Sequence, residues 1–333
     1  MLSGVQGLAD EIPIPDEYAG QRFDRVLARL FPDYSRSQLK GWIEAGHARL
    51  DGQAVRPREP VHGGQLASLD APDRLDEHSS VSAQAIPLHI VYEDEDLVVL
   101  DKPPGLVVHP GAGNPDGTLE NALLHRFPEL AAVPRHGLIH RLDKDTSGLL
   151  VIARSSRAHA RLTEAMQARE IVRRYQALVI GSMPSGGTVD APLARHPVDR
   201  KRIAVRQGGR EAVTHYRVAE RFPFHTLLDV KLETGRTHQI RVHMAHVRYP
   251  IVGDPVYGRR LSVPRGATET LAESLRGFRR QALHAARLSL THPVSGETIE
   301  VAAELPTDFQ ALLRALREDA RAREAEARRR ADR

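Results

Sequence analysis

The sequence predicts an α+β protein made of two domains joined by a linker. In residues 24–31 and 37–44 the apolar side chains recur at helical spacing, whereas from residue 87 onward short apolar runs bounded by turns are typical of strands. Between these regions, residues 71–86 are acidic, rich in serine and poor in large apolar side chains, as expected of a linker. A chain of 333 residues has enough material for about two domains with substantial cores.

The composition excludes several classes of protein. The chain has no cysteine, which excludes disulfides, thiolate zinc sites and a cysteine nucleophile. No apolar run approaches the roughly 20 residues that a membrane-spanning helix needs. Residues 1–10 lack the basic and apolar regions of a signal peptide. We therefore expect a cytoplasmic protein without membrane contact.

The basic residues are almost all arginine. Of the 47 Lys and Arg residues, all are arginine except Lys40, Lys102, Lys144, Lys201 and Lys231, and the formal net charge is +4 at pH 7. The planar arginine fork matches phosphate oxygens and stacks on bases, so this composition favours an RNA partner. A coding bias toward arginine is the alternative explanation.

The first unit, residues 20–70, is expected to contain two helices and a hairpin. Ser35 or Ser37 can cap the second helix, and the strand that follows enters a turn at Asp51-Gly52. Aspartate and glycine both favour turns, so a compact unit with short elements is predicted here.

Three short segments of this unit, 20–24, 34–37 and 55–57, resemble the S4 RNA-binding domain. In that family a basic helical face meets RNA phosphates, so the resemblance implies an RNA-binding role. The residues expected to contact RNA in this unit are Arg22, Arg25, Arg36, Lys40 and Arg56. The alternative is that these side chains only solvate a helix face.

The most informative segment of the chain is 140–151, His-Arg-Leu-Asp-Lys-Asp-Thr-Ser-Gly-Leu-Leu-Val. It begins with charged groups crowded around Asp143 and leads into an apolar run, 149–153, typical of a buried strand. An acid buried beside a fixed cation stays ionised and aimed. Asp143 is therefore the first candidate for a catalytic group.

Other interpretations of the Asp143-x-Asp145 pattern fit less well. An EF-hand loop needs a bidentate glutamate at its twelfth position, which is Arg154 here. A phosphatase that forms an aspartyl-phosphate carries its nucleophile after an apolar strand, whereas here the apolar run comes second. Asp145 is expected only to hold the turn. The histidines within 238–246 lack a metal-binding motif, so no metal is expected.

Four further segments carry more charged and aromatic groups than a plain scaffold needs. They are 101–111, 173–179, 232–244 and 253–258. The first is expected to be a strand that enters a Pro-Pro-Gly turn, resumes and stops at His-Pro-Gly, and the second opens a strand with two cations and a tyrosine. In the third, alternation predicts a strand with Gln239, Arg241 and His243 on one face.

Together, these segments resemble the RluA family of pseudouridine synthases. The resemblance rests on the segment from residue 140 and on Gly-Arg-Thr-His-Gln-Ile-Arg-Val-His from residue 235, and it spans nearly the whole chain. It implies a catalytic domain over 87–316 with a large, twisted, mostly antiparallel sheet and flanking helices. Matches at 107–113 and 195–197 are closest to the branch that modifies large-subunit ribosomal RNA.

The resemblance also implies roles for individual residues. Asp143 is implied to be the catalytic carboxylate, Arg241 the cation that keeps it ionised, and Tyr175 the ring that stacks on the flipped base and accepts the C5 proton. Whether Asp143 attacks the sugar or removes a proton from it stays open. The residues implied to line the base pocket are Arg141, Leu283 and His140.

The implied reaction needs few outside groups. Converting uridine to pseudouridine breaks the glycosidic bond, turns the base and joins C5 to the sugar, without redox change or net hydrolysis. We therefore expect no cofactor. A stacked uridine cannot be reached by a side chain, so the nucleotide must be flipped into a pocket.

The branch resemblance implies a ribosomal partner, either large-subunit RNA or its precursor particle, with target uridines in the helix 69 stem-loop of 23S rRNA. Arg200, Lys201 and Arg202 are expected to belong to the RNA track. Two alternatives stay open, namely a synthase for another rRNA or tRNA site, and a catalytically silent S4-type ribosome assembly factor. We expect a monomer with an extended leader over 1–19 and a solvated helical tail over 317–333.

Overall fold

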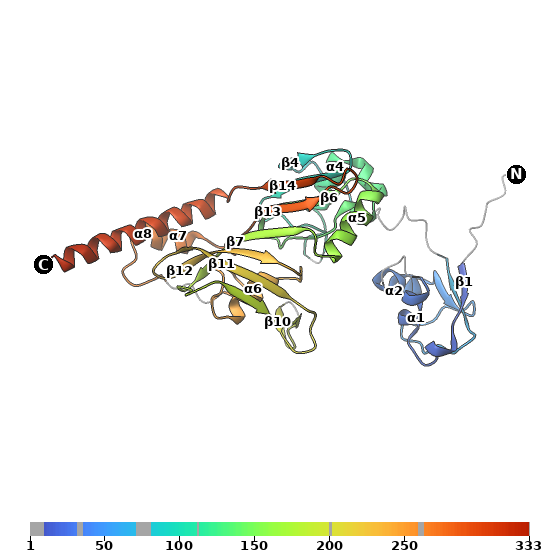
Figure 1. Cartoon of the computed structure of the whole chain (residues 1–333). Coiled ribbons are helices and arrows are strands. Elements are labelled where there is room, and N and C mark those ends of the chain that lie inside the picture. The colour runs from blue at the N-terminus through green and yellow to red at the C-terminus, as the bar shows by residue number, and fades with distance from the viewer. Residues whose placement is uncertain are drawn as a thin grey trace. The chain divides into compact units, whose positions relative to one another are not determined.

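The computed structural model divides the chain into two compact units, Met1–Ser80 and Val81–Arg333 (Figure 1). Each unit buries a hydrophobic cluster of its own. The residues that the structure describes are 10–31, 36–70, 81–111, 113–199, 202–258 and 263–332.

The first unit combines two helices and a three-stranded antiparallel sheet around one core. Helices α1 (Phe23–Leu30) and α2 (Arg36–Ala45) begin and end within one residue of the expected positions. The sheet has the order β1-β3-β2. Its elements are β1 (Asp10–Pro13), β2 (Ala48–Leu50) and β3 (Leu66–Leu69), with the short 3-10 helix η1 (Asp16–Tyr18) after β1.

The turn predicted in this unit is confirmed, because Asp51 and Gly52 have φ of 50° and 73°. Strand β2 ends just before that turn and pairs along its length with β3, which begins sixteen residues further on. Across the turn itself, Leu50 forms only an isolated bridge with Gln53. The expected cap Ser35 and the side chain of Ser37 lie outside the described residues.

The second unit is built on one large mixed sheet of nine strands. The order is β4-β5-β6-β13-β7-β12-β11-β8, with β14 paired to β13. Every pairing is antiparallel except that of β6 with β13. The strands are β4 (Ile90–Glu93), β5 (Leu97–Lys102), β6 (Ser147–Ala153), β7 (Val172–Ile180), β8 (Gly187–Asp190), β11 (Val213–Arg221), β12 (His225–Leu232), β13 (Leu283–Thr291) and β14 (Thr298–Ala302). The α+β class and the mostly antiparallel sheet are confirmed.

A separate hairpin and several helices surround this sheet. The hairpin joins β9 (Leu193–Arg195) to β10 (Ile203–Val205). The helices are α4 (Leu119–Arg126), α5 (Ser156–Gln167), α6 (Gln239–His246), α7 (Glu269–Gly277) and α8 (Thr307–Ala331), with 3-10 helices η2 (Pro128–Ala132) and η3 (Pro134–Gly137). Thr118, Ser155 and Thr268 cap α4, α5 and α7 through their hydroxyl oxygens. Within the described ranges, no helix is both long and apolar enough to cross a membrane.

The strand expected over Gln239, Arg241 and His243 is wrong, because this segment forms helix α6. Alternation normally separates a buried face from a solvated one, but every residue from Gln239 to Met244 is buried, including the polar ones. A helix buried on all sides loses the 3.6-residue signal that would have identified it. As a consequence, Arg241 and His243 point in different directions instead of sharing one face.

The strand expected to resume after the Pro-Pro-Gly turn is also absent from the described residues, since β5 ends at Lys102. The carbonyls of Val107 and Val108 instead accept hydrogen bonds from the first N–H groups of α4, at Leu119 (2.8 Å) and Glu120 (3.1 Å). These donors have no partner within their own helix. The carbonyls at 107–108 therefore satisfy the N–H groups of a helix end instead of joining a sheet.

The C-terminal helix differs from the expected solvated tail in where it begins. Helix α8 starts at Thr307 and runs through Leu316 without a break, and its buried residues continue to Asp319. Arg323 donates a 2.7 Å hydrogen bond to Asp319, one turn earlier. Only the part beyond this pair has the solvated character expected for 317–333.

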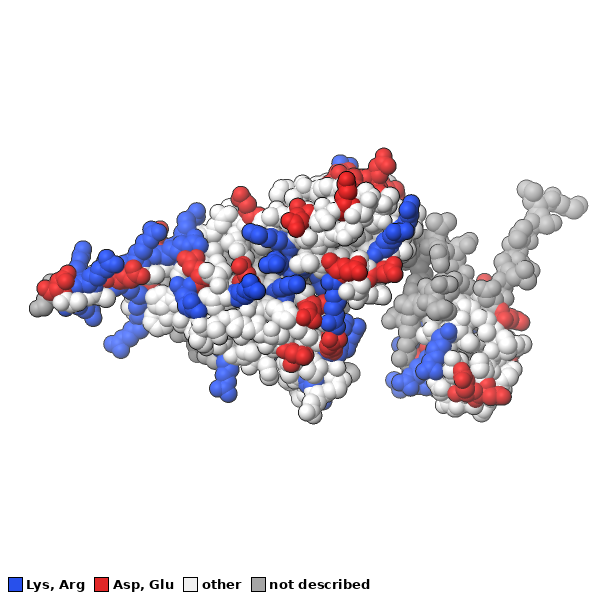
Figure 2. All heavy atoms as spheres, viewed as in Figure 1, with Lys and Arg blue, Asp and Glu red and all other residues white. Residues whose placement is uncertain are grey.

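Three basic side chains stand in register on one face of the sheet. Arg174 on β7 is paired directly with Arg287 on β13 and with Lys231 on β12. All three are exposed, and none forms an ion pair with another residue in the described ranges. Like charges placed directly opposite each other oppose strand pairing. We call Arg174, Lys231 and Arg287 the cation row; Figure 2 shows Lys and Arg side chains gathered over the middle of this sheet.

Candidate active site

Asp143 lies in the turn that leads into the buried strand β6. Its carbonyl accepts a 3.0 Å hydrogen bond from the Thr146 N–H, which closes the turn. Lys102, at the end of the neighbouring strand β5, is buried and donates from Nζ to the carbonyl of Lys144 at 2.9 Å. The turn that carries Asp143 is thus held by β6 after it and by the buried Lys102, whose pKa is lowered by burial to about 7. The Asp143 side chain remains 18% exposed.

Arg241 joins two carboxylates. Its Nη1 donates to Asp143 Oδ2 at 2.9 Å, while Nε and Nη2 donate to the two oxygens of Asp254 at 2.7 and 2.9 Å. Asp254 Oδ1 also accepts hydrogen bonds from the N–H groups of Val256 and Tyr257. Arg241 is therefore held by a bidentate pair behind it and presents its remaining nitrogen to Asp143.

The electrostatics of this pair favour the charged forms. Burial alone would raise the pKa of Asp254, but the hydrogen bonds and charge of Arg241 outweigh it and the pKa lies below its ordinary value. Burial alone would lower the pKa of Arg241, but its hydrogen bonds to Asp254 and the charge of Asp143 raise it instead. A permanent positive charge therefore faces the Asp143 carboxylate.

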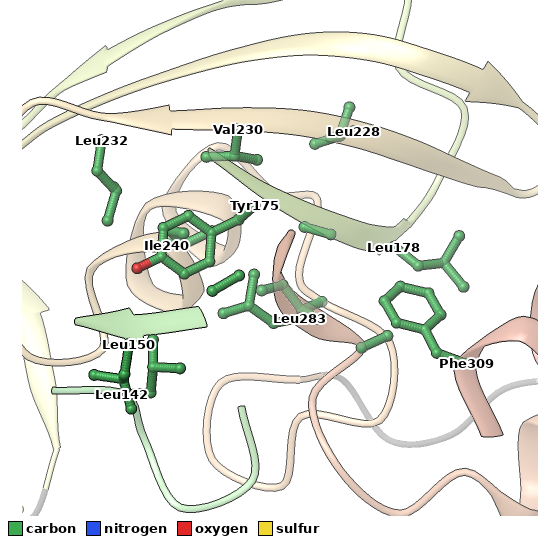
Figure 3. Packing of buried hydrophobic residues seen from close by; sticks show 14 of the residues in the cluster. Leu142, Leu150, Tyr175, Leu178, Leu228, Val230, Leu232, Ile240, Leu283 and Phe309 are labelled. Carbon is green, nitrogen blue, oxygen red and sulfur yellow. The ribbon is translucent and has the colours of Figure 1, made fainter. Parts of the chain in front are cut away.

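Tyr175, on β7, forms an apolar wall of the site. Figure 3 shows its ring among Leu142, Leu232, Ile240 and Leu283, with the hydroxyl at the edge of the cluster. Burial raises the pKa of the Tyr175 phenol, and Asp143 adds to this while Arg173 opposes it. The phenol therefore keeps its proton near neutral pH.

One cleft of about 540 Å³ is lined by every predicted member of the site. Asp143, Tyr175 and Arg241 come from a turn, a strand and a helix that are far apart in the sequence. The predicted pocket residues in the same lining are Arg141, Leu283 and His140. Arg141 is exposed and Leu283 is buried at the first position of β13. Further cations line the same cleft, namely Arg135, Arg169, Arg210 and Arg236 and the buried Arg173.

His140 has a local contact that sequence reasoning did not anticipate. Its Nε2 accepts a 3.2 Å hydrogen bond from the Val151 N–H of β6. Burial, with a smaller effect of the Arg173 charge, lowers the pKa of His140 to about 3. A neutral His140 therefore ties the segment before Asp143 to the strand after it.

Three residues of the site were not predicted, namely Asp254, His238 and Tyr257. His238 precedes α6 in the left-handed conformation (φ 56°), and its Nδ1 lies 2.8 Å from the Tyr257 hydroxyl. Its Nε2 lies 3.8 Å from Asp143 Oδ1. All three lie in segments that the sequence marks as unusual, 232–244 and 253–258. Their contacts with one another are visible only in the folded protein, so no local sequence pattern could reveal them.

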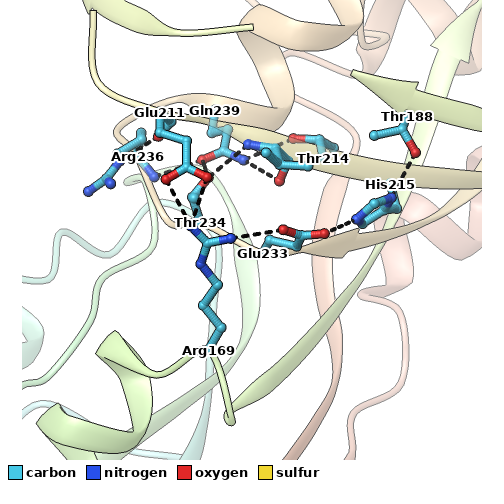
Figure 4. A network of polar contacts seen from close by, with 10 residues as sticks. Arg169, Thr188, Glu211, Thr214, His215, Glu233, Thr234, Arg236 and Gln239 are labelled. Atoms are coloured by element: carbon cyan, nitrogen blue, oxygen red, sulfur yellow. Dashed lines mark hydrogen bonds and ion pairs between the residues drawn. The ribbon is translucent and has the colours of Figure 1, made fainter. Parts of the chain in front are cut away.

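The loop before α6 is held by a polar network, shown in Figure 4. The Gln239 amide donates to Val213 and Thr214 and accepts from the Thr234 hydroxyl and the Arg236 N–H. At the rim, Arg169 donates to both oxygens of Glu211 at 2.8 Å and to Glu233 at 3.0 Å.

A steric constraint explains the glycine at position 235 of this loop. A Cβ there would lie 2.6 Å from the Nη1 of Arg173, which lines the cleft. A side chain at 235 would therefore displace that arginine from the site.

The residues predicted to contact RNA do not form a single group in the structure. Arg22, Lys40 and Arg56 line one groove of the first unit, where Arg22 pairs with Asp24 at 2.9 Å. Arg25 is exposed on α1. Arg202 lies with its guanidinium carbon 5.4 Å from the centre of the Tyr257 ring. Outside what the structure describes are the side chain of Arg36 and the residues Arg200 and Lys201.

Comparison with known proteins gives consistent matches to both units. Residues 96–246 match the family model described as RNA pseudouridylate synthase, and residues 21–66 match the S4 domain. The chain is 58% identical over 317 residues to ribosomal large subunit pseudouridine synthase D of Xanthomonas campestris pv. campestris, covering 95% of each chain. It is 52% identical over 307 residues to the protein of that name from Escherichia coli K12, covering 92% of this chain and 94% of that one.

Solved structures agree with these sequence matches. Human RNA Pseudouridylate Synthase Domain Containing 4 superposes with a TM-score of 0.56 at 28% identity, covering 69% of this chain and 93% of that one. Human RNA Pseudouridylate Synthase Domain Containing 1 gives 0.52 at 26% identity, covering 67% and 86%. The fold, the paired Asp143 and Arg241, and relatives that are alike over nearly their whole length lead to one conclusion: the chain belongs to the RNA pseudouridylate synthase family and carries an S4 domain.

Proposed function

We propose that this protein isomerises uridine to pseudouridine in the 23S RNA of the large ribosomal subunit. The observation that carries the proposal is the pairing of Asp143 with the fixed cation Arg241 in a cleft walled by Tyr175. The relatives that are 58% and 52% identical over most of the chain are named as large-subunit pseudouridine synthases. The class of RNA is inferred from the names of these relatives, and the reaction is inferred from the residues of the cleft.

Asp143 is the proposed catalytic carboxylate. Arg241 occupies its Oδ2, whereas Oδ1 accepts no hydrogen bond from the residues that the structure describes. Attack on the sugar and removal of a sugar proton both need an ionised carboxylate with an available oxygen. Oδ1 is the oxygen that meets this need, because Arg241 holds the other one.

Tyr175 is proposed to stack on the flipped uracil, since a flat ring in an apolar wall suits a base. Isomerisation removes one proton from C5 and delivers one to N1 after the N1–C1′ bond has broken. The Tyr175 phenol starts protonated because burial raises its pKa. We therefore propose that it gives its proton toward N1 before it accepts the C5 proton, so that the proton count balances over the reaction.

The other cleft residues are proposed to hold the RNA in its opened form. Arg141 is exposed at the cleft, so it can enter the gap that the flipped nucleotide leaves. Leu283 packs beside Tyr175 as an apolar wall for the base. His140 is proposed to support the Asp143 turn through its contact with β6.

RNA outside the cleft is proposed to meet two groups of cations. One is the groove of the S4 domain lined by Arg22, Lys40 and Arg56, and the other is the cation row on the large sheet. Phosphate contacts of this kind release counterions, so binding should weaken steeply with salt. The proposed domain boundaries are 20–70 for the S4 domain and 87–316 for the catalytic domain, in a cytoplasmic monomer.

The test is incubation of the full-length protein with fragments of 23S rRNA, followed by mapping of pseudouridine. The wild type should modify uridine, and Asp143→Asn should lose activity while its affinity for the RNA stays within about threefold. A wild type that binds tightly but modifies nothing would favour the alternative of a silent assembly factor. An active Asp143→Asn would show that another group performs the chemistry.

The helix 69 stem-loop is the proposed location of the target uridines, on the basis of the branch resemblance. A pseudouridine map of ribosomal RNA from cells that lack this protein tests it directly. The map should lose pseudouridine in helix 69 and keep it elsewhere. Loss of pseudouridine at a different rRNA or tRNA position would show that the target lies outside helix 69, while the proposed reaction would still stand.

A further inference from the structure

A series of polar contacts runs from the β9–β10 hairpin to the carboxylate of Asp143. The Ile203 N–H donates to the Tyr257 hydroxyl oxygen at 2.8 Å, and that oxygen lies 2.8 Å from His238 Nδ1. The other ring nitrogen of His238 lies 3.8 Å from Asp143 Oδ1. The opposite carboxylate oxygen is the one bound by Arg241.

The hydrogen bonds of the Tyr257 hydroxyl define the tautomer of His238. The Tyr257 oxygen already accepts from Ile203, and its own O–H has no other acceptor among the described residues than His238 Nδ1. Burial raises the pKa of Tyr257, so the phenol keeps its proton. A histidine that accepts at Nδ1 carries its proton on Nε2. The N–H of His238 therefore faces Asp143.

His238 is also kept uncharged. Burial lowers its pKa, and the charges of Arg241 and Arg141 act in the same direction, while Asp143 and Asp254 oppose them. A neutral donor can orient a carboxylate without neutralising it, whereas a second full positive charge would reduce its basicity.

We infer that His238, fixed by Tyr257, is a positioning residue that donates its Nε2–H to Asp143 Oδ1 when the uridine is bound. At 3.8 Å the contact is too long for a hydrogen bond in the free protein. Catalytic hydrogen bonds of unliganded enzymes commonly shorten in the complex. With Oδ2 bound by Arg241 and one lone pair of Oδ1 bound by His238, two donors orient the plane of the carboxylate, one from α6 and one from the residue before it. The second lone pair of Oδ1 stays available to the sugar.

This inference deepens the proposed function, because it rests on Asp143 as the catalytic group. Replacing His238 by Asn or by Gln distinguishes a positioning role from a purely structural one. Gln at 238 places an amide N–H near the position of Nε2 and so reaches toward Asp143, while Asn reaches only the position of Nδ1. The backbone at 238 is left-handed, a conformation that Asn tolerates better than Gln.

A positioning role and a purely structural role of His238 therefore predict opposite orders of activity for the Gln and Asn variants. If His238 positions Asp143, His238→Gln should keep at least tenfold more single-turnover activity than His238→Asn on the same 23S rRNA fragment, in line with a lost hydrogen bond to a charged group. Thermal unfolding should rank the variants the other way, with Asn the more stable. Both should bind the RNA with wild-type affinity within about threefold.

Tyr257→Phe completes the test, because it keeps the ring and removes the hydroxyl that selects the tautomer. Its activity should fall between those of the wild type and His238→Asn, with RNA affinity unchanged. Equal rates for the Gln and Asn variants, or rates that follow their thermal stability, would overturn the inference. Asp143→Asn in the same assay keeps the two proposals apart: if it is active, the proposed function fails, and if it is inactive while Gln and Asn are equal, only the role of His238 fails.

Discussion

Two arginines of the catalytic domain each join two carboxylates, and they differ mainly in burial. Arg241 joins Asp143 and Asp254 with side chains that are 5%, 18% and 0% exposed. Arg169 joins Glu211 and Glu233 at the rim, with side chains that are 41%, 57% and 34% exposed. The distances are alike, at 2.7 to 2.9 Å in the first case and 2.8 to 3.0 Å in the second.

The comparison teaches that ion-pair geometry alone does not define a functional group. Charges away from water interact strongly, but each also loses its hydration, so a buried group left without its partner is destabilising. Exposed pairs lose little when they are broken, because water and salt replace the partner. The buried triad of Arg241, Asp143 and Asp254 can therefore orient Asp143, the proposed catalytic carboxylate. The rim triad of Arg169, Glu211 and Glu233 at most orders a loop.

The largest effect is expected from Asp254→Asn. The amide can still accept from the backbone of Val256 and Tyr257, but it leaves the buried Arg241 with one anion instead of two. Removing one partner of a buried pair typically costs about 3–5 kcal/mol, so the free energy of unfolding in urea should fall by that order. Pseudouridine formation should also slow, because Arg241 is no longer held against Asp143. The matched control Glu211→Gln should change neither quantity appreciably; similar losses in both variants would contradict the comparison.

A smaller effect, with a defined sign, is expected from acid. The pKa of Asp254 in the folded protein lies below the ordinary value of about 3.9. A group with a depressed folded pKa stabilises the fold above its unfolded pKa and loses that contribution as the pH falls through the folded pKa. The stability difference between wild type and Asp254→Asn should therefore be constant above about pH 5 and shrink below about pH 4. Urea unfolding of both proteins from pH 3 to 7 measures it, and a difference that grows toward acid would contradict the assignment.

The sequence indicated which residues would lie together better than it indicated how the fold brings them together. Asp143, Tyr175 and Arg241 sit in long linear motifs, and the structure places all three in one cleft. Asp254 was missed because a single aspartate thirteen residues beyond Arg241 has no local pattern that marks it as a partner. Its role depends on the loop after α6 folding back over the helix.

The fold shows the same limit. Strands β5, β6 and β7 alternate or run apolar in ways that a sequence reveals, whereas α6 is buried on every side and imitates a strand. The parallel pairing of β6 with β13 joins Ser147 to His284, more than a hundred residues away, and no local pattern encodes it. Tertiary burial, rather than local preference, decided both features.

The smallest effect is expected from Arg169→Gln, and its dependence on salt is the most direct test of the comparison. Arg169 is exposed, so its ion pairs are screened by mobile ions over about 8 Å at 0.15 M ionic strength and about 3 Å at 1 M. Any loss of stability at 0.05 M NaCl should be a small fraction of the loss in Asp254→Asn, and it should vanish at 1 M NaCl. The loss in Asp254→Asn should persist at 1 M, because ions cannot reach a buried pair. If both losses vanish together, burial does not separate the two triads and the comparison fails.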